Sequence, residues 1–325
     1  MNILPLDIIQ YEIVKYLDQI DLLCYRSISH KYNFIVLNYD FIYNIKSDIM
    51  KYLIENKIHY SKVIPFKKIS LNLSNKRINN DNDFQYIQDV HTLNIKWCNQ
   101  KTITDKAFSY LNKLVSLNMS KCNQTTITDN AFKNLKNLEI LNMSDCNQPT
   151  ITDRAFENLT KLRILNMSEC NQQTITDKAL KKLKNVEILN IKLCKQLTDK
   201  TFENLKKLKK LNIGYCIQIT DKALKNLINL ERLEMMWCNQ ETITDEAFKN
   251  LKKLEYLSIY QCNQKTITNK IFEYVKGIKY LDIGYCIQLT ITKDNYKYIK
   301  DTRMNYAAIY NVLEEYRNKI SIKFI

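Results

Sequence analysis

The sequence predicts an α/β solenoid, in which short strand–helix units stack so that parallel strands lie on the inside and helices on the outside. Nine cysteines recur at intervals of 24, 24, 24, 24, 22, 22, 24 and 24 residues, and spacing that regular indicates a repeat. They are Cys98, Cys122, Cys146, Cys170, Cys194, Cys216, Cys238, Cys262 and Cys286. Glycine and proline number only three each, so tight hairpins and glycine-rich phosphate loops are not expected.

Each unit begins with a short strand. Residues 135–156 read LKNLEILNMSDCNQPTITDRAF, and in this unit Leu141 and Met143 alternate with Asn142. A period of two places apolar side chains on one face of a strand and polar side chains on the other. Ten such strands are expected, opening at Leu71, Leu93, Leu117, Leu141, Leu165, Leu189, Leu211, Leu233, Leu257 and Leu281.

A polar turn and a short helix follow each strand. Asp153 ends the turn NQPTITD and is expected to cap the helix, because its carboxylate can accept the free N–H groups of the first turn. Ala155 and Phe156 then begin an apolar stripe, and units with two such stripes must stack to bury both. The same cap is expected at Asp105, Asp129, Asp177, Asp199, Asp221, Asp245 and Asn269. A calcium site would instead need several oxygen ligands converging on one point.

The polar strand positions predict a ladder of side-chain amides on the solvent face. Its members are Asn72, Asn94, Asn118, Asn142, Asn166, Asn190 and Asn212, after which Glu234, Ser258 and Asp282 take the position. Amides stacked at strand spacing are expected to hydrogen-bond along the array and stabilise the sheet.

The order L-x-x-L-x-L-x-x-C, I-T-D and short helix resembles the leucine-rich repeat, and within it the cysteine-containing subtype. The units at Cys194 and Cys216 are two residues short, and the deletion falls in the turn. The resemblance implies an inner face about 40 Å long, which suits a protein or peptide better than a metabolite.

The cysteines are expected to be buried structural thiols whose S–H groups reach neighbouring carbonyls. There is no C-x-x-C pair, so zinc ribbons and thioredoxin-like redox sites are not expected. Only three histidines occur, His30, His59 and His91, and no motif places a nucleophile beside them. We therefore expect no enzyme, cofactor or metal site, although the partners of a cysteine-dependent ligase would meet only in the fold.

Residues 1–40 differ from the repeats in not being basic and in having a helical pattern. The order L-P-x-D-I-I, I-x-x-Y-L, D-L-L and I-S-x-x-Y resembles the F-box, with Tyr32 where that family usually has Trp. The resemblance implies docking on the Skp-type adaptor of a cullin ubiquitin ligase, and a chain similar to the F-box and leucine-rich-repeat proteins of giant amoeba viruses. The apolar F-box positions are Leu4, Pro5, Ile8, Ile9, Ile13, Leu17, Leu22 and Leu23. The alternative is a plain helical cap on the solenoid.

The remaining boundaries follow from the repeats. Residues 41–68 are expected to form a helical connector, residues 69–300 the repeats, and residues 301–325 a closing C-terminal cap. With this organisation, the expected function is that of the substrate receptor of the ligase, with an unidentified target protein on the repeats. A repeat protein that sequesters a partner without ubiquitin transfer is the alternative.

Large side chains gather at the exposed strand positions of the second half, and aromatic residues on such a face are typical of interface hot spots. The candidate partner-binding residues are Trp97, Tyr215, Arg232, Met236, Trp237, Tyr256, Tyr260, Tyr280 and Tyr285. Arg232 is expected to meet an acidic or phosphorylated group. In the alternative, these rings pack on one another or on the C-terminal cap.

Charge and hydropathy restrict the location and the partners. Lysine and arginine number 49 against 34 acidic residues, a net charge of +15, yet the lysines concentrate in segments such as NLKKLKKL and are expected on the outer face. Nucleic acid is the weaker partner for that reason, since it needs basic and aromatic residues on one surface. No apolar run reaches the ~20 residues that span a bilayer. Together with the absence of a signal-peptide pattern, this predicts a cytoplasmic protein, in the host cytoplasm if the chain is viral.

Overall fold

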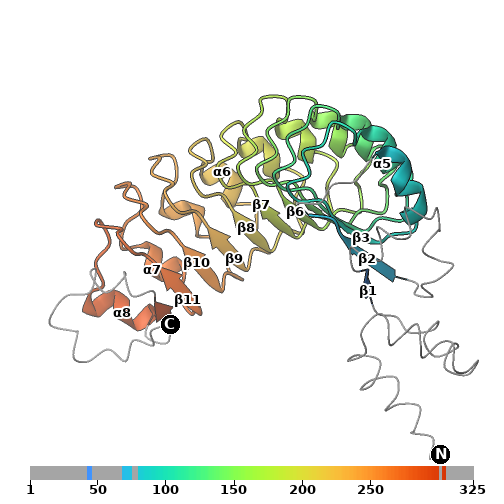
Figure 1. Cartoon of the computed structure of the whole chain (residues 1–325). Coiled ribbons are helices and arrows are strands. Elements are labelled where there is room, and N and C mark those ends of the chain that lie inside the picture. The colour runs from blue at the N-terminus through green and yellow to red at the C-terminus, as the bar shows by residue number, and fades with distance from the viewer. Residues whose placement is uncertain (1–41, 46–67, 75–79, 300–301, 305–325) are drawn as a thin grey trace, which may run out of the picture. The chain divides into compact units, whose positions relative to one another are not determined.

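The computed structural model describes residues 42–45, 68–74, 80–299 and 302–304 (Figure 1). The chain divides into two compact units, Met1–Leu138 and Glu139–Ile325. We call them unit 1 and unit 2. The eight adaptor-docking positions expected between Leu4 and Leu23 lie outside the described residues, as does most of the expected connector and of the C-terminal cap.

The described part of unit 1 contains four strands that pair in chain order and in parallel. They are β1 (Ile42–Ile45), β2 (Lys68–Asn72), β3 (Thr92–Asn94) and β4 (Ser116–Asn118). Its helical turns are η3 (Asp81–Ile87), α5 (Asp105–Ser109) and η4 (Asp129–Phe132). Strand β1 lies inside the segment expected to be a helical connector, where its β-branched residues pair with the first repeat strand instead.

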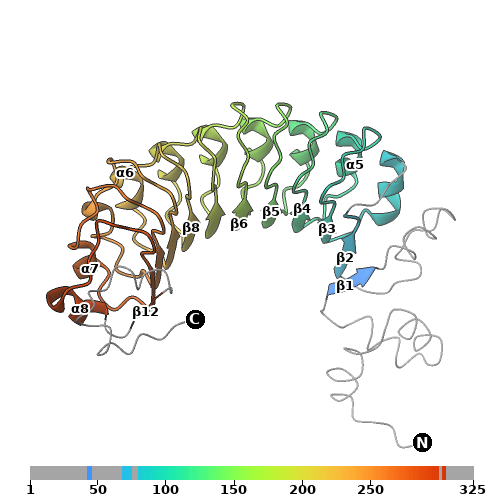
Figure 2. The ribbon, with the colours of Figure 1, turned by 60° about the vertical axis from the view of Figure 1, so that its left-hand side comes forward.

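Unit 2 continues the same pattern, with eight parallel strands in chain order among its described residues. The strands are β5 (Ile140–Asn142), β6 (Ile164–Asn166), β7 (Ile188–Asn190), β8 (Lys210–Asn212), β9 (Arg232–Glu234), β10 (Tyr256–Ser258), β11 (Tyr280–Asp282) and β12 (Arg303–Met304). The helical turns are η5 (Asp153–Phe156), η6 (Asp177–Leu180), η7 (Asp199–Phe202), α6 (Asp221–Leu224), η8 (Asp245–Ala247), α7 (Ile271–Tyr274) and α8 (Lys293–Ile299). Within unit 2 the strands line one side and the helical turns the other (Figure 2). The predicted solenoid of stacked strand–helix units is confirmed.

The core of each unit consists of the apolar positions of the repeat. Leu141, Met143 and Phe156 are buried, and so are their counterparts in the neighbouring repeats. The cysteines are buried as expected, and most of their thiols donate to a carbonyl of the preceding unit: Cys170 Sγ lies 3.0 Å from the carbonyl oxygen of Met143. Cys98 Sγ instead accepts from Gln100 Nε2 at 3.3 Å. Burial raises the pKa of Cys194 to about 12. The donating cysteines therefore hold neighbouring units together as neutral thiols.

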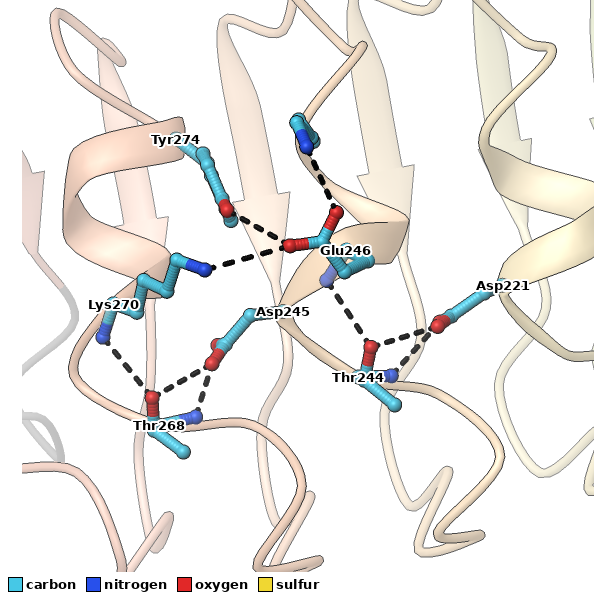
Figure 3. Close-up of polar contacts among 8 residues, drawn as sticks. Asp221, Thr244, Asp245, Glu246, Thr268, Lys270 and Tyr274 are labelled. Atoms are coloured by element: carbon cyan, nitrogen blue, oxygen red, sulfur yellow. Dashed lines mark hydrogen bonds and ion pairs between the residues drawn. The ribbon is translucent and has the colours of Figure 1, made fainter.

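The expected role of the repeated aspartate is wrong. Thr152, not Asp153, is the N-cap of η5, and its hydroxyl accepts the backbone N–H of Arg154. Asp153 is the first helical residue, and its carboxylate reaches the next repeat, where it accepts the N–H and the hydroxyl of Thr176, each at 2.7 Å. Figure 3 shows the equivalent bonds from Asp221 to Thr244 and from Asp245 to Thr268. We call this pair of bonds the Asp–Thr clasp.

Asn269 departs from the expected cap in the same way. The turn α7 begins without a side-chain cap. Asn269 instead accepts the N–H of Thr290 through its Oδ1 atom at 2.9 Å. An amide has one acceptor oxygen where a carboxylate has two, so it keeps only the backbone bond of the clasp.

The expected amide ladder lies at a different position in the repeat. The strand residue Asn142 accepts the N–H of Ser144 in its own unit, at 3.1 Å, and so caps the end of its strand. Bonds between units come from other asparagines, among them the one that follows the cysteine in several of the 24-residue repeats: Asn147 Oδ1 accepts the N–H of Asn171 at 2.7 Å. Of the strand asparagines, Asn212 bonds to the next unit, where it donates to Glu234 at 2.8 Å. Position in the turn, where a backbone N–H points along the stack, decides which asparagine links the units.

The residue before each repeat cysteine has a positive φ. The nine residues, with φ between 55° and 65°, are Trp97, Lys121, Asp145, Glu169, Leu193, Tyr215, Trp237, Gln261 and Tyr285. Left-handed backbone at a residue with a side chain costs about 1–2 kcal/mol. In return, the tight bend turns the chain from the strand into the polar turn and sends these side chains to the surface.

Candidate functional site

The candidate site is the solvent face of strands β8 to β11 in unit 2. The first residues of β9, β10 and β11 are Arg232, Tyr256 and Tyr280, and the parallel register places them side by side. The period-two alternation points all three away from the core, as the sequence predicted.

These three side chains form one stacked row. The Arg232 guanidinium carbon lies 3.5 Å from the centroid of the Tyr256 ring, and the Tyr256 and Tyr280 rings stack at 4.4 Å and 4°. Arg232 Nε also bonds to Glu234 at 2.7 Å, and Glu234 accepts from Asn212 at 2.8 Å. The acidic group expected to meet Arg232 is thus supplied by this chain.

A second row runs along the bend before the cysteines. Tyr215 and Trp237 stack at 5.8 Å, and Tyr260 and Tyr285 meet edge to face at 5.3 Å. These side chains remain accessible, since Trp237 is 40% and Tyr285 50% exposed. The rings therefore pack on one another, as the alternative expected, and still present aromatic surface to solvent.

Burial and neighbouring charge keep the phenols neutral. The pKa of Tyr280 is raised to about 12, chiefly by burial and then by Tyr256 and Asp282. The pKa values of Tyr256 and Tyr260 are raised as well, with burial the largest cause for each. At neutral pH these hydroxyls are hydrogen-bond donors and acceptors, which suits polar recognition at an aromatic surface.

Two of the expected partner-binding residues need separate description. Trp97 belongs to unit 1, where Lys121 Nζ lies 4.5 Å from its ring centroid. Met236 is half-buried on the sheet face of unit 2, one residue before Trp237. The structure thus brings together Tyr215, Arg232, Tyr256, Trp237, Tyr260, Tyr280 and Tyr285 as touching pairs or rows.

Aliphatic residues beside the second row were missed by the sequence analysis. Ile217 is 55% and Ile287 83% exposed, and each occupies the position after a repeat cysteine that asparagine takes in most other repeats. The signal was in the sequence as the change from C-N-Q to C-I-Q. Asp282 was assigned to the solvent face but is buried, and it accepts the hydroxyl of Ser258 at 3.0 Å.

The opposite side of unit 2 carries a small polar cluster around Glu246 (Figure 3). Its carboxylate meets Lys249 at 3.2 Å, Tyr274 at 3.0 Å and Lys270 at 3.4 Å, and these partners, Lys249 first, lower the pKa of Glu246. Because the charged members of the cluster are exposed, screening by water and salt leaves it little effect on stability.

One lysine-rich segment lies mainly between a helical turn and the following strand. NLKKLKKL covers residues 204–211; its first three lysines are in the turn between η7 and β8, and the fourth, Lys210, begins β8. The described residues contain no group of three potential metal ligands. None of the helices in the described part of the chain has the length and apolar character needed to cross a bilayer.

Known structures share this fold over most of the chain. TLR13, in its complex with ssRNA13, matches 85% of this chain and 41% of its own at 20% identity and a TM-score of 0.53. Toll of the Drosophila Toll–Spatzle complex matches 81% of this chain and 34% of its own, at 14% identity and a TM-score of 0.58. The mouse RP105/MD-1 complex contains a chain that matches 82% of this chain and 48% of its own, at 18% identity and a TM-score of 0.58. The chain thus spans less than half the length of these structures, and the similarity concerns the fold.

The sequence matches no curated protein at a significant level. The family model for the BspA-type leucine-rich repeat region matches it in two overlapping segments, residues 53–187 and 173–301. Repeats of this architecture typically act as binding scaffolds with an extended surface along the strands. The chain belongs to the BspA-type leucine-rich repeat family.

Proposed function

We propose that this protein is a non-catalytic receptor that binds a partner protein on the sheet face of unit 2. The observation that carries the proposal is the pair of aromatic rows on β8 to β11, where seven large side chains are preorganised by stacking. Rings already fixed in place lose little conformational freedom on binding, which is why aromatic residues dominate interface energetics.

The receptor is proposed to serve an SCF-type ubiquitin ligase. Support comes from residues 1–40, whose L-P-x-D-I-I and following anchors resemble the F-box. In this function, the amino-terminal segment holds the Skp-type adaptor and its cullin, and the repeats hold the target. Tethering raises the effective concentration of the target's lysines near the conjugating enzyme, so the chain itself needs no catalytic residue. Such a receptor works in the cytoplasm, that of the host if the chain is viral.

The first experiment measures capture of purified Skp-type adaptor by the full chain. We expect capture by the wild type and by Trp97→Ala, and its loss in the double variant Leu4→Ala/Ile8→Ala. Thermal unfolding of all three proteins establishes that the repeats remain folded. If the wild type captures no adaptor, the ligase assignment is wrong, and the repeats remain a module that sequesters its partner.

A second experiment tests the aromatic rows. Trp237→Ala and Tyr260→Ala remove surface rings, so we expect both variants to keep the fold and to lose the partner. The matched control is Tyr274→Ala, which removes a ring from the opposite side of unit 2. Partner binding that survives both substitutions on the sheet face would exclude this face as the binding surface.

A further inference from the structure

The two 22-residue repeats change the surface of unit 2. In the longer repeats, the asparagine after the cysteine accepts a backbone N–H of the next unit: Asn147 from Asn171 at 2.7 Å and Asn239 from Asn263 at 2.6 Å. In the short repeats that position is Lys195 and Ile217. Neither side chain can accept a hydrogen bond, so the polar ladder is interrupted over these two units.

Apolar side chains take the place of that ladder. Leu193 and Tyr215, in the left-handed position before the cysteines of the short repeats, are half-buried. Ile217 is the more exposed, and the Tyr215 ring stacks on Trp237 of the following unit. Leu193, Tyr215, Ile217 and Trp237 thus come from three successive repeats and face solvent at the same edge of the sheet.

Three lysines belong to the same two short repeats, with Lys210 at the start of β8. The Lys192 stem lies against Gly214, where its Cγ would be 3.4 Å from an added Cβ, and its ammonium is 5.7 Å from the Tyr215 ring centroid. Lys195 and Lys210 are exposed. We call Lys192, Leu193, Lys195, Lys210, Tyr215, Ile217 and Trp237 the short-repeat surface.

The positive charge of this surface is not neutralised within the described chain. No carboxylate among the described residues lies within 4 Å of the ammonium groups of Lys192, Lys195 or Lys210, whereas the nearby Glu187 is held by Arg163 and Lys209. Glu234 is likewise held by Arg232. Acidic residues occupy the left-handed position before the cysteine only in the two units that precede the short repeats, where they are Asp145 and Glu169.

We propose that the short-repeat surface binds an acidic protein segment that also carries large apolar side chains. The inference rests on the proposed receptor function and names the chemistry of its partner. Three lysines without carboxylate partners attract acidic residues, and the charge match sets orientation and on-rate. Leu193, Ile217 and the exposed part of Trp237 supply apolar area for hydrophobic anchors.

Single-stranded nucleic acid also binds to surfaces that carry basic and aromatic residues together, but such surfaces offer open ring faces on which successive bases stack. Here Tyr215 and Trp237 turn faces toward each other at an interplanar angle of 13°, and the remaining apolar groups are aliphatic. This geometry favours a protein segment.

The test is a selection of random 12-residue peptides displayed on phage against the full chain, followed by affinity measurements on the enriched peptides. We expect the enriched sequences to contain more Asp and Glu than Lys and Arg, together with at least one large apolar residue. The charge-reversed variant Lys192→Glu/Lys195→Glu/Lys210→Glu should bind them at least tenfold more weakly, and Trp237→Ala should lose a similar factor. The matched control Lys178→Glu/Lys182→Glu/Lys222→Glu reverses three exposed lysines in the outer turns and should bind within twofold of wild type.

The outcomes separate this inference from the function on which it rests. If peptide binding depends on Trp237 but not on the three lysines, this face still binds a partner, and the proposal that the partner is acidic is overturned. Absence of any enriched peptide, or equal losses in the two triple variants, would overturn the short-repeat surface as a docking site. A 12-nucleotide oligo(U) that binds more tightly than the peptides, with the same dependence on the lysines, would replace the acidic segment by single-stranded RNA.

Discussion

The Asp–Thr clasp gives the sharpest prediction about stability. Asp153 accepts two hydrogen bonds from Thr176 of the next repeat, one from the backbone and one from the hydroxyl. A hydrogen bond to a charged group contributes about 1.5–3 kcal/mol. Both residues are half-buried, so water can partly replace the lost bonds, and we take the lower end. Asp153→Ala should therefore lower the free energy of unfolding of unit 2 by about 3 kcal/mol, that is, two bonds at ~1.5 kcal/mol each.

Asp153→Asn should cost about half as much, ~1.5 kcal/mol, because one bond to the carboxylate is lost and one is kept. The chain already contains this case, since Asn269 bonds the N–H of Thr290 through its single acceptor oxygen. The difference between the alanine and asparagine variants then measures the backbone bond alone.

Urea unfolding in a Trp97→Phe background is the assay, because Trp237 is then the only tryptophan and lies in the same unit as the clasp. The control is Glu157→Ala, which truncates an exposed acid in the same repeat. A double-mutant cycle with Thr176→Val isolates the bond between the hydroxyl and the carboxylate, with an expected coupling of about 1.5 kcal/mol. A coupling below about 0.5 kcal/mol, or equal losses for Asp153→Ala and Glu157→Ala, would refute the clasp as a source of stability.

Three further predictions follow from individual residues. Glu169 has a φ of 64°, so Glu169→Asn should raise the melting temperature, whereas Glu169→Val should lower it because a β-branched residue tolerates this backbone poorly; the same sign for both would contradict the strain. Gln148 is 1% exposed, and neither polar atom of its amide has a hydrogen-bond partner among the described residues, so Gln148→Met should stabilise the protein by about 1–3 kcal/mol, and a destabilised variant would point to a bound water at the amide. The pKa of Tyr280 is raised to about 12, which means that the unfolded chain ionises first. Its contribution to stability is complete below pH ~10 and is lost as the pH rises toward ~12. The melting temperature of Tyr280→Phe should therefore fall less steeply than that of the wild type as the pH rises across that window.

Much of the fold could be predicted from the sequence because the pattern of apolar and polar residues within each repeat specifies its strand and its helical turn. The alternation of Leu141, Asn142 and Met143 decides which strand face is buried, and a period of 24 residues requires identical units to stack. The burial of the cysteines follows from the same periodicity, since a small apolar residue at a fixed place in every unit meets its counterparts in the core. For the candidate site, the strand register was enough to predict that Tyr215, Arg232, Trp237 and Tyr256 share one face.

The contacts between units could not be predicted in this way. Asp153 looked like a cap because local sequence shows only the helix that follows it, whereas its true partner Thr176 lies a full repeat away. The choice between Asn142 and Asn147 as the linking amide likewise depends on where the next unit's N–H groups point.

The repeat, its core and the side chains that reach solvent all depend on periodicity within one chain segment, and so they could be inferred before any coordinates. The pairing of Arg232 with Glu234, and the lack of a carboxylate partner for Lys192, Lys195 and Lys210 among the described residues, became visible in the folded chain. The interaction energy of a charged group depends on the distance to its neighbours and on their solvation, and both are set only when the units stack.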